Sequence, residues 1–216
     1  DLVDFKQPEI SDTDLKAPIY IDFGPTSLSA TPWNNITSHQ ESSTTSWIKD
    51  VENNYTNIGV RVLDGFTATH AGVGSEPASP VTVDGVEFPL TAWKDGLLVK
   101  GEKNQGDVGP GRIEISQLDV ARKYNFTILA IRFNGSKDAR ISSYKLVGKT
   151  ESAVKEVKTG IKDAASFAAA NFEEYIAKFE NVEPDSEGKV IVEVKGLDTG
   201  SAAEGHINAL CISLAK

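Results

Sequence analysis

The chain has 216 residues and a formal net charge of −9 at neutral pH, with 31 acidic and 22 basic side chains. A nucleic acid or an anionic membrane surface would require a basic face, so the charge balance argues against both partners. With 39% hydrophobic residues, the chain can bury a sizeable core as one large β domain or two small ones. No apolar run is as long as a membrane span.

We expect residues 1–17 to be a flexible acidic N-terminal segment, because they are polar and contain few apolar anchors. Order is predicted to begin at Pro18, since apolar and polar residues alternate in IYIDF (19–23) before Gly24-Pro25 ends the strand. No boundary between two domains is visible, so residues 18–216 are expected to form a single domain.

The next part of the chain alternates long polar connections with short strands. Residues 26–57 are rich in Ser, Thr and Asn, and such a long connection tends to be functional or to pack over the core. A strand is predicted over 58–63 and a surface loop over 67–80. In VTVDGVEF (81–88), the Asp84-Gly85 pair between apolar runs predicts a hairpin.

Further strands are predicted at 97–99 and in GRIEISQL (111–118), on either side of a Gly-rich turn at 101–111. The segment Leu118–Val147 is then predicted to be a core hairpin, two strands joined by a polar loop at 134–140. Its first strand is apolar on both faces, which indicates a position near the middle of the structure. The expected core residues are Tyr124, Phe126, Ile128, Tyr144 and Leu146.

Residues 150–172 are ambiguous. The Ala-rich run AASFAAANF favours a short helix around 160–172, whereas its position between strands favours a strand and a loop, and both stay open. Alternation then returns in 175–179, 190–195 and 206–214, where the single cysteine, Cys211, is expected to be a buried apolar residue without a disulfide. Strands without βαβ alternation predict an all-β fold, an antiparallel sandwich.

Two features bear on the compartment. The chain begins at Asp1 and has no Met, so we expect that a leader was removed. Asn-x-Ser/Thr triplets would be glycan acceptors only in a eukaryotic secreted protein. They begin at Asn35, Asn54, Asn125 and Asn134.

Three pairs of segments carry a family resemblance. They are IYIDFGP (19–25) with PWNN (32–35), LDVARKYNFTILAIR (118–132) with DARISSYKLVG (138–148), and FENVEPDSEGKVIVEV (179–194) with INALCISL (207–214). Together they resemble the galactose-binding-like jelly-roll domains of secreted and cell-surface bacterial proteins. The resemblance covers nearly the whole chain from Pro18.

The resemblance implies a jelly-roll β-sandwich that acts as a non-catalytic carbohydrate-binding or accessory module, with a glycan as partner. It also implies secretion or display on a bacterial surface, where a lipid anchor on the removed leader is one means of attachment. The module would be a monomer or part of a larger assembly. Many such domains hold a structural calcium ion, but no acidic run here has the spacing of a calcium loop, so the metal is unassigned and no cofactor is expected.

Ordinary structural roles are expected within the same segments. Leu118 and Tyr124 should lie in the core, Asp119 should cap a turn, and Gly188 should supply a positive φ before a strand.

A sugar site needs exposed aromatic rings for the C–H faces of the sugar and planar polar groups for its hydroxyls. If the loops meet at one end of the sandwich, the candidates are Trp33, Asn34, Trp47, Trp93, Asp138 and Arg140. The competing interpretation is that the tryptophans plug the sandwich while Asp138 and Arg140 form a local ion pair.

No catalytic residue is predicted. The histidines, His39, His70 and His206, are not spaced as a zinc pair, and His206 is expected to be a polar edge residue rather than a general base. Two alternatives stay open: a structural or protein-interaction sandwich without a sugar ligand, and a glycoside hydrolase or esterase-associated domain with an unrecognised carboxylate site.

Overall fold

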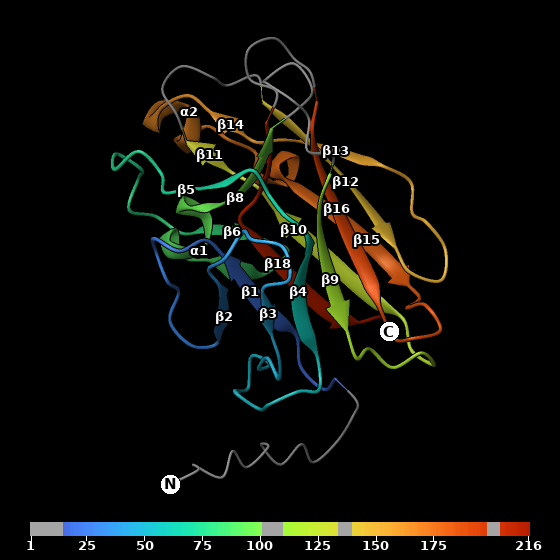
Figure 1. Cartoon of the computed structure of the whole chain (residues 1–216). Coiled ribbons are helices and arrows are strands. Elements are labelled where there is room, and N and C mark those ends of the chain that lie inside the picture. The colour runs from blue at the N-terminus through green and yellow to red at the C-terminus, as the bar shows by residue number, and fades with distance from the viewer. Residues whose placement is uncertain (1–14, 101–109, 134–139, 198–203) are drawn as a thin grey trace, which may run out of the picture.

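The computed structural model describes residues 15–100, 110–133, 140–197 and 204–216, and shows a sandwich of β-sheets with two short α-helices (Figure 1). In chain order the elements are β1 Ile19–Phe23, β2 Trp33–Ile36, β3 Thr44–Thr45, β4 Gly59–Asp64, β5 Ala68–His70, β6 Val81–Val83, β7 Val86–Phe88, α1 Leu90–Lys94, β8 Gly96–Lys100, β9 Gly111–Ser116, β10 Tyr124–Leu129, β11 Arg132–Phe133, β12 Ile141–Val147, β13 Lys155–Lys158, β14 Gly160–Ile161, α2 Ala164–Ala168, the 3-10 helix η2 Phe172–Tyr175, β15 Ile176–Val182, β16 Val190–Gly196, β17 Glu204–Ile207 and β18 Ala209–Leu214.

Two large sheets form the sandwich. The five-stranded sheet has the order β15-β10-β18-β1-β2, and the six-stranded sheet has the order β13-β12-β16-β9-β4-β3. Their pairings are antiparallel except for β1 with β2, which is parallel. A smaller sheet, β17-β8-β5, adjoins them. The all-β, largely antiparallel sandwich expected from the sequence is confirmed.

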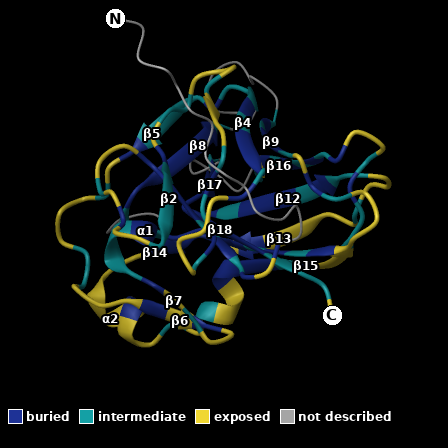
Figure 2. Cartoon of the chain, turned by 90° about the horizontal axis from the view of Figure 1, so that it is seen from below, coloured by how far each residue is buried: buried dark blue, intermediate teal, exposed yellow. Residues whose placement is uncertain are grey.

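The main core lies between the two large sheets. In β1, Ile19, Ile21 and Phe23 face this core and are fully buried, as the alternation of the strand requires. The five core residues predicted from Leu118–Val147 are all buried there. Figure 2 shows the same pattern, with buried strands in the centre and exposed residues mainly in the surrounding loops.

A second core covers part of the outer face of the five-stranded sheet. It consists of residues from β6, β7, α1, α2 and η2 packed on Leu129 of β10 and Cys211 of β18. This layer explains why β10 is apolar on both faces, since Phe126 faces the main core and Leu129 faces the second core.

The prediction that Leu118–Val147 forms a hairpin is wrong, because its two strands do not pair with each other. β10 belongs to the five-stranded sheet, whereas β12 pairs with β13 and β16 in the other sheet. Between them the chain crosses from one sheet to the other, and β11 pairs in parallel with β14. Each strand therefore contributes its apolar face from the opposite side of the main core.

Several local predictions are confirmed. Asp84 and Gly85 have φ values of 52° and 75° in the turn between β6 and β7. Asp119 accepts a hydrogen bond from Ala121 N at 2.8 Å, and Gly188 has a φ of 74°. Cys211 is buried as expected.

The ambiguous segment contains both kinds of structure. α2 is the short helix, capped by Asp163, whose carboxylate accepts a hydrogen bond from Ser166 N at 2.8 Å. β13 and β14 precede it.

Order also extends beyond two of the predicted limits. The predicted loop at 67–80 includes β5, and Leu15 already packs in the main core ahead of Pro18. Residues 1–14 and most of the predicted turn at 101–111 lie outside the described residues.

Candidate functional site

The structure brings Trp33 and Trp93 to the same second core but places Arg140 elsewhere. Trp33 and Asn34 lie on β2, Trp93 lies in α1, and Arg140 directly precedes β12, which belongs to the other sheet. Figures 1 and 2 both show β2 and β12 on different sides of the molecule. Asp138 lies outside the described residues, so its proposed ion pair with Arg140 stays a prediction.

Trp33 forms a half-buried aromatic pair with Tyr20 on the outer face of the five-stranded sheet. The ring centroids are 5.1 Å apart with an interplanar angle of 39°. Trp33 also contacts Phe88 of β7 at a centroid distance of 5.8 Å, so the second core fixes the ring from one side. The pair therefore offers aromatic surface that is supported from below.

The sheet register extends this pair into a row of side chains. Tyr20 is opposite both Trp33 and Cys211, and Thr127 is opposite both Cys211 and Lys178. Since residues opposite one another in neighbouring strands point to the same face, these five form what we call the outer row. It runs from an aromatic end on β2 to a cationic end on β15, and Cys211 between the two ends is buried in the second core.

The cationic end of the outer row is held by acidic residues. Lys178 forms ion pairs with Asp84 from the β6–β7 turn and with Glu173 of η2, the latter at 2.9 Å. All three side chains are at least one-third exposed. The row thus combines aromatic rings with polar and charged groups on one face.

The side chain of Asn34 supports the backbone around the aromatic pair. Its amide nitrogen donates to Tyr20 O at 2.9 Å and Lys49 O at 2.7 Å, and its oxygen accepts from Lys49 N at 2.8 Å. Both amide hydrogens are thereby engaged within the chain, so Asn34 positions its neighbours rather than offering a free donor.

The other two tryptophans differ in exposure. Trp93 is fully buried, donates a hydrogen bond from Nε1 to Ser79 O at 3.0 Å and stacks on Phe167 with ring centroids 4.9 Å apart. It has no exposed surface for a ligand, as the competing interpretation expected. Trp47 is half-buried with a φ of 53°, and its ligand role stays a prediction.

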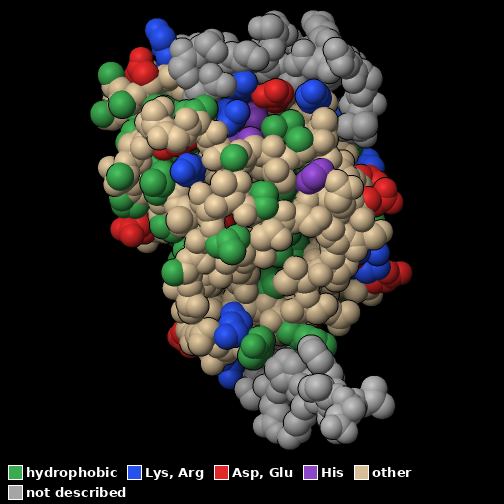
Figure 3. Space-filling view, turned by 60° about the vertical axis from the view of Figure 1, so that its left-hand side comes forward, with side chains coloured by type: hydrophobic (Ala, Val, Ile, Leu, Met, Phe, Trp, Pro, Cys, Tyr) green, Lys and Arg blue, Asp and Glu red, His purple; other side chains and the backbone are tan. Residues whose placement is uncertain are grey.

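A second group of side chains, which we call the Arg–His cluster, lies beside the β17-β8-β5 sheet. Arg140 Nε is 3.1 Å from Glu204 Oε2, and His206 Nε2 is 3.5 Å from the same oxygen. The rings of His206 and His70 meet edge to face with centroids 5.1 Å apart, and Arg132 Nη1 is 3.4 Å from His70 Nδ1. Figure 3 shows basic, acidic and histidine side chains gathered near the upper end of the molecule.

The backbone around His206 is tightly held. Its N–H donates to Ser142 Oγ at 2.8 Å, and its carbonyl accepts a hydrogen bond from the Tyr144 hydroxyl. Gly96 provides the space beside it, because a Cβ there would lie 2.5 Å from Ile207 O and 3.0 Å from His70 Nε2. His206 lies on β17, an edge strand of the β17-β8-β5 sheet as predicted, but it is fully buried rather than exposed.

Burial controls the charges in this cluster. It lowers the pKa of both His70 and His206, and each arginine nearby lowers these pKa values further. Both imidazoles are therefore neutral at pH 7. Burial also lowers the pKa of Arg132 and of Arg140, while Glu204 acts against the shift in both cases.

Sequence reasoning placed only Arg140 of this cluster in a site. The other members, His70, Arg132, Glu204 and His206, come from β5, β11 and β17. No spacing pattern joins residues from such distant strands, so only the sheet topology could have revealed the group.

Two buried carboxylates, Asp22 and Asp95, hold the loop after β1. Asp95 Oδ2 accepts from Thr26 N at 2.7 Å and Ser27 N at 3.0 Å, and Asp22 Oδ2 accepts from Ser29 N at 3.0 Å. Burial, with the Asp95 charge as a smaller contribution, raises the pKa of Asp22 to about 7. Within the described residues, no three His, Cys, Asp or Glu side chains are grouped for a metal ion.

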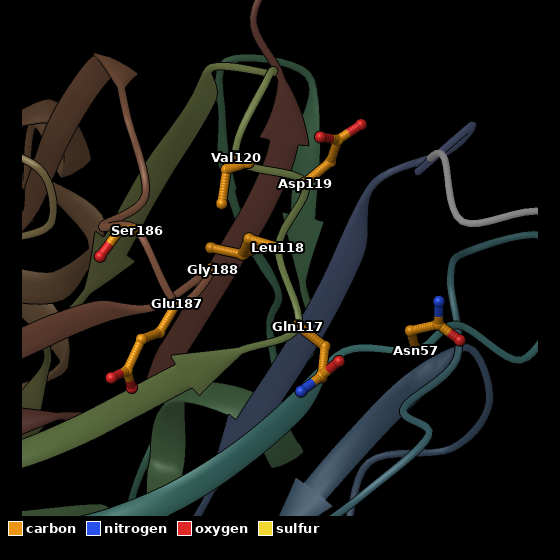
Figure 4. Close-up of a pocket in the computed structure, with 8 residues that line it drawn as sticks. All are labelled: Asn57, Gln117, Leu118, Asp119, Val120, Ser186, Glu187 and Gly188. Atoms are coloured by element: carbon orange, nitrogen blue, oxygen red, sulfur yellow. The ribbon is translucent and has the colours of Figure 1, made fainter.

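An open groove of about 420 Å³ lies at the end of the sandwich where β9 ends and β16 begins. Figure 4 shows Leu118 and Val120 on one side, Glu187 and Gly188 on another, and Asn57 across the opening. Val120 is 58% exposed there. Its lining mixes polar and charged side chains with Leu118 and Val120, and the described residues of this lining include no aromatic ring on which a sugar could stack.

Within the described residues, no helix is long and apolar enough to cross a membrane.

Comparison with known proteins gives limited information. No family model matches the chain, and no curated protein matches it. One similar solved structure is TmCBM61 in complex with β-1,4-galactotriose, with 13% identity, a TM-score of 0.33, and coverage of 56% of this chain and 71% of that one. Another is the plant receptor-like kinase ANX1, with 8% identity, a TM-score of 0.46, and coverage of 84% of this chain and 56% of that one. Likenesses this distant leave the site to be argued from its own geometry.

Proposed function

We propose that the chain is a non-catalytic carbohydrate-binding module of a secreted or cell-surface protein, and that the aromatic end of the outer row is its sugar site. The observation that carries the proposal is the half-buried pair of Tyr20 and Trp33 at the open edge of the five-stranded sheet. A sugar ring stacks on such a pair through its C–H groups, because these bonds pack well on aromatic faces.

The polar members of the outer row lie beyond the buried Cys211, so they would orient only a saccharide long enough to cross the β6–β7 hairpin. Thr127 carries a hydroxyl, and Lys178 with Asp84 presents charged donors and acceptors at the other end. Sugar hydroxyls need both kinds of partner, and a few placed polar groups are sufficient to select one epimer. The support of Trp33 by Phe88 keeps the aromatic end preorganised, which lowers the entropic cost of binding.

Binding is tested by calorimetry with β-1,4-galactotriose and a panel of other neutral oligosaccharides. We expect at least one saccharide to bind, and Trp33→Ala to weaken that binding about tenfold or more, since a central aromatic contact commonly carries this much. Trp33→Phe should recover part of the affinity.

The matched control is Tyr55→Ala. Tyr55 is 48% exposed but contacts Lys49 outside the outer row, so its loss should leave the affinity unchanged. If no neutral saccharide binds to a protein that is folded by circular dichroism, or if Tyr55→Ala and Trp33→Ala weaken binding equally, the outer row is not a sugar site. A chromogenic glycoside and ester panel should show no turnover.

A further inference from the structure

The Arg–His cluster buries two guanidinium groups. Arg132 and Arg140 each carry a positive charge, and the carboxylates of Glu204 and Glu76 act on Arg132 from nearby. Arg140 is only 2% exposed, so its guanidinium lies where an unpaired donor is strongly unfavourable.

Several buried nitrogen atoms of these described side chains have no hydrogen-bond partner. Among the described residues, Arg132 Nε, Arg140 Nη1 and His70 Nε2 are buried donors without a hydrogen-bond partner. His206 Nδ1 is also buried and unpaired, but it is the acceptor nitrogen of the neutral ring, because Nε2 faces the Glu204 carboxylate. Buried polar groups in native proteins are nearly always paired, so several orphaned groups in one place indicate a partner outside this set.

We propose that the Arg–His cluster is a binding site for a carboxylate group. A monoanion would meet less repulsion from Glu204 and Glu76 than a dianion such as phosphate. A carboxylate is planar and accepts two parallel hydrogen bonds, which suits a guanidinium donor. The neutral imidazole of His70, whose Nδ1 faces Arg132, adds a donor at Nε2 without adding charge.

The exposure of the cluster fits entry from the surface. Arg132 and Glu204 are partly exposed, with 18% of the Glu204 side chain accessible, whereas Arg140 and His206 lie behind them. A carboxylate from solvent would therefore reach Arg132 first. This site uses none of the outer-row residues, so the proposal does not depend on the sugar-binding function.

The experiment titrates wild-type protein with sodium acetate, galacturonate, galactose or phosphate at pH 7 and constant ionic strength. Melting temperature and the ¹⁵N shifts of the histidine side chains are followed together. We expect acetate and galacturonate to raise the melting temperature and to move the signals of His70 and His206 but not those of His39, which lies outside the cluster.

Comparison of the ligands identifies the source of the carboxylate. Galacturonate binding about tenfold tighter than acetate, with galactose inactive here, would identify an acidic saccharide. Equal affinities would identify any small carboxylate. Tighter binding of phosphate than of acetate would overturn the carboxylate assignment, and so would the absence of any histidine shift with both carboxylates.

Variants separate a site from a general salt effect. Arg132→Gln should weaken carboxylate binding about tenfold, because it removes a charge-assisted donor. Arg61→Gln is the matched control, since it makes the same substitution in β4, where Arg61 pairs with Glu114 at 3.5 Å, and it should leave binding unchanged. Equal weakening in both variants would contradict the proposal.

The chain's own carboxylate is tested through Asp138→Asn. If the Asp138 carboxylate occupied the site, this variant would lose stability, acetate would restore it, and acetate would have no effect on the wild type. That combination would overturn the proposal. A wild-type response that Asp138→Asn leaves unchanged supports it.

Discussion

At the residue scale, the polar side chains of this protein mostly hold backbone, and few are free for ligands. Asn34 hydrogen-bonds to the backbone of Tyr20 and of Lys49. Asp22 and Asp95 accept hydrogen bonds from backbone N–H groups of the loop that follows β1. From the sequence alone, Asn34 beside Trp33 looked like a sugar ligand. What decides between the two roles is whether backbone groups lie within hydrogen-bonding reach, and that is a tertiary property.

Asp22 should make stability depend on pH in an unusual direction. Its pKa is about 7 in the folded state against an ordinary value of 3.8, so the folded state retains a proton that the unfolded state releases. Its contribution to stability is fully present below about pH 4 and declines as the pH rises to about 7, by at most about 4 kcal/mol. Asp22→Asn, which stays neutral, should therefore gain in melting temperature relative to wild type between pH 4.5 and 8.

Asp163→Asn is the control, because the stability contribution of Asp163 should depend on pH in the opposite direction to that of Asp22. The hydrogen bond from Ser166 N lowers the pKa of Asp163, so this variant should be less stable than wild type at pH 7, with the difference shrinking as the pH falls through the folded pKa. Parallel pH profiles for wild type and Asp22→Asn would contradict the assignment of Asp22.

At the element scale, turns fix which strands approach each other. Gly188 precedes β16 with a φ of 74°, and its backbone packs against the segment that follows β9, where Leu118 N donates to Gly188 O at 2.9 Å. An added Cβ would lie 2.5 Å from Leu118 O. The residue therefore combines a left-handed conformation with a close approach of two backbones.

Gly188→Ala should be clearly more destabilising than Gly85→Ala. Both glycines have similar positive φ values, 74° and 75°, but a Cβ at Gly85 would meet nothing within 4 Å. We expect the free energy of unfolding to fall by about 1 kcal/mol for Gly85→Ala, which has only the conformational cost, and by about 2 to 3 kcal/mol for Gly188→Ala. Urea unfolding measures both losses. Equal losses would show that the contact with Leu118 relaxes without cost.

The strands and turns could be predicted from sequence because alternation and Asp-Gly or Gly signals are local. The partners of the strands could not. β10 and β12 are separated by a short polar segment that suits a hairpin, yet they lie in different sheets because each presents an apolar face to the same core. The Arg–His cluster escaped prediction for the same reason, since its members converge only after the sheets are assembled.

At the scale of the whole molecule, two hydrophobic cores share one sheet. Strands β10, β15 and β18 contribute residues to the core on each face of the five-stranded sheet. Since neither core can lose this sheet and remain packed, the two should unfold together.

Phe167→Ala tests this coupling. Phe167 is 6% exposed and stacks on Trp93 in the second core, so its loss should cost about 3 kcal/mol and lower the melting temperature. Calorimetry should still show a single transition. Val154→Ala, at a position 59% exposed, should change the melting temperature little. Two separate transitions for Phe167→Ala would show that the second core unfolds independently.

The hydrogen bonds of Asn34 have a consequence for self-association. β2 is the edge strand of the five-stranded sheet, and an open edge offers unpaired N–H and C=O groups to another chain. Through Asn34, the backbone of Lys49 is fastened alongside this edge, much as a further strand would be. The Asn34 side chain thus helps to prevent strands of neighbouring molecules from pairing with this edge. The aromatic pair of Tyr20 and Trp33 can remain accessible without promoting aggregation through the edge strand.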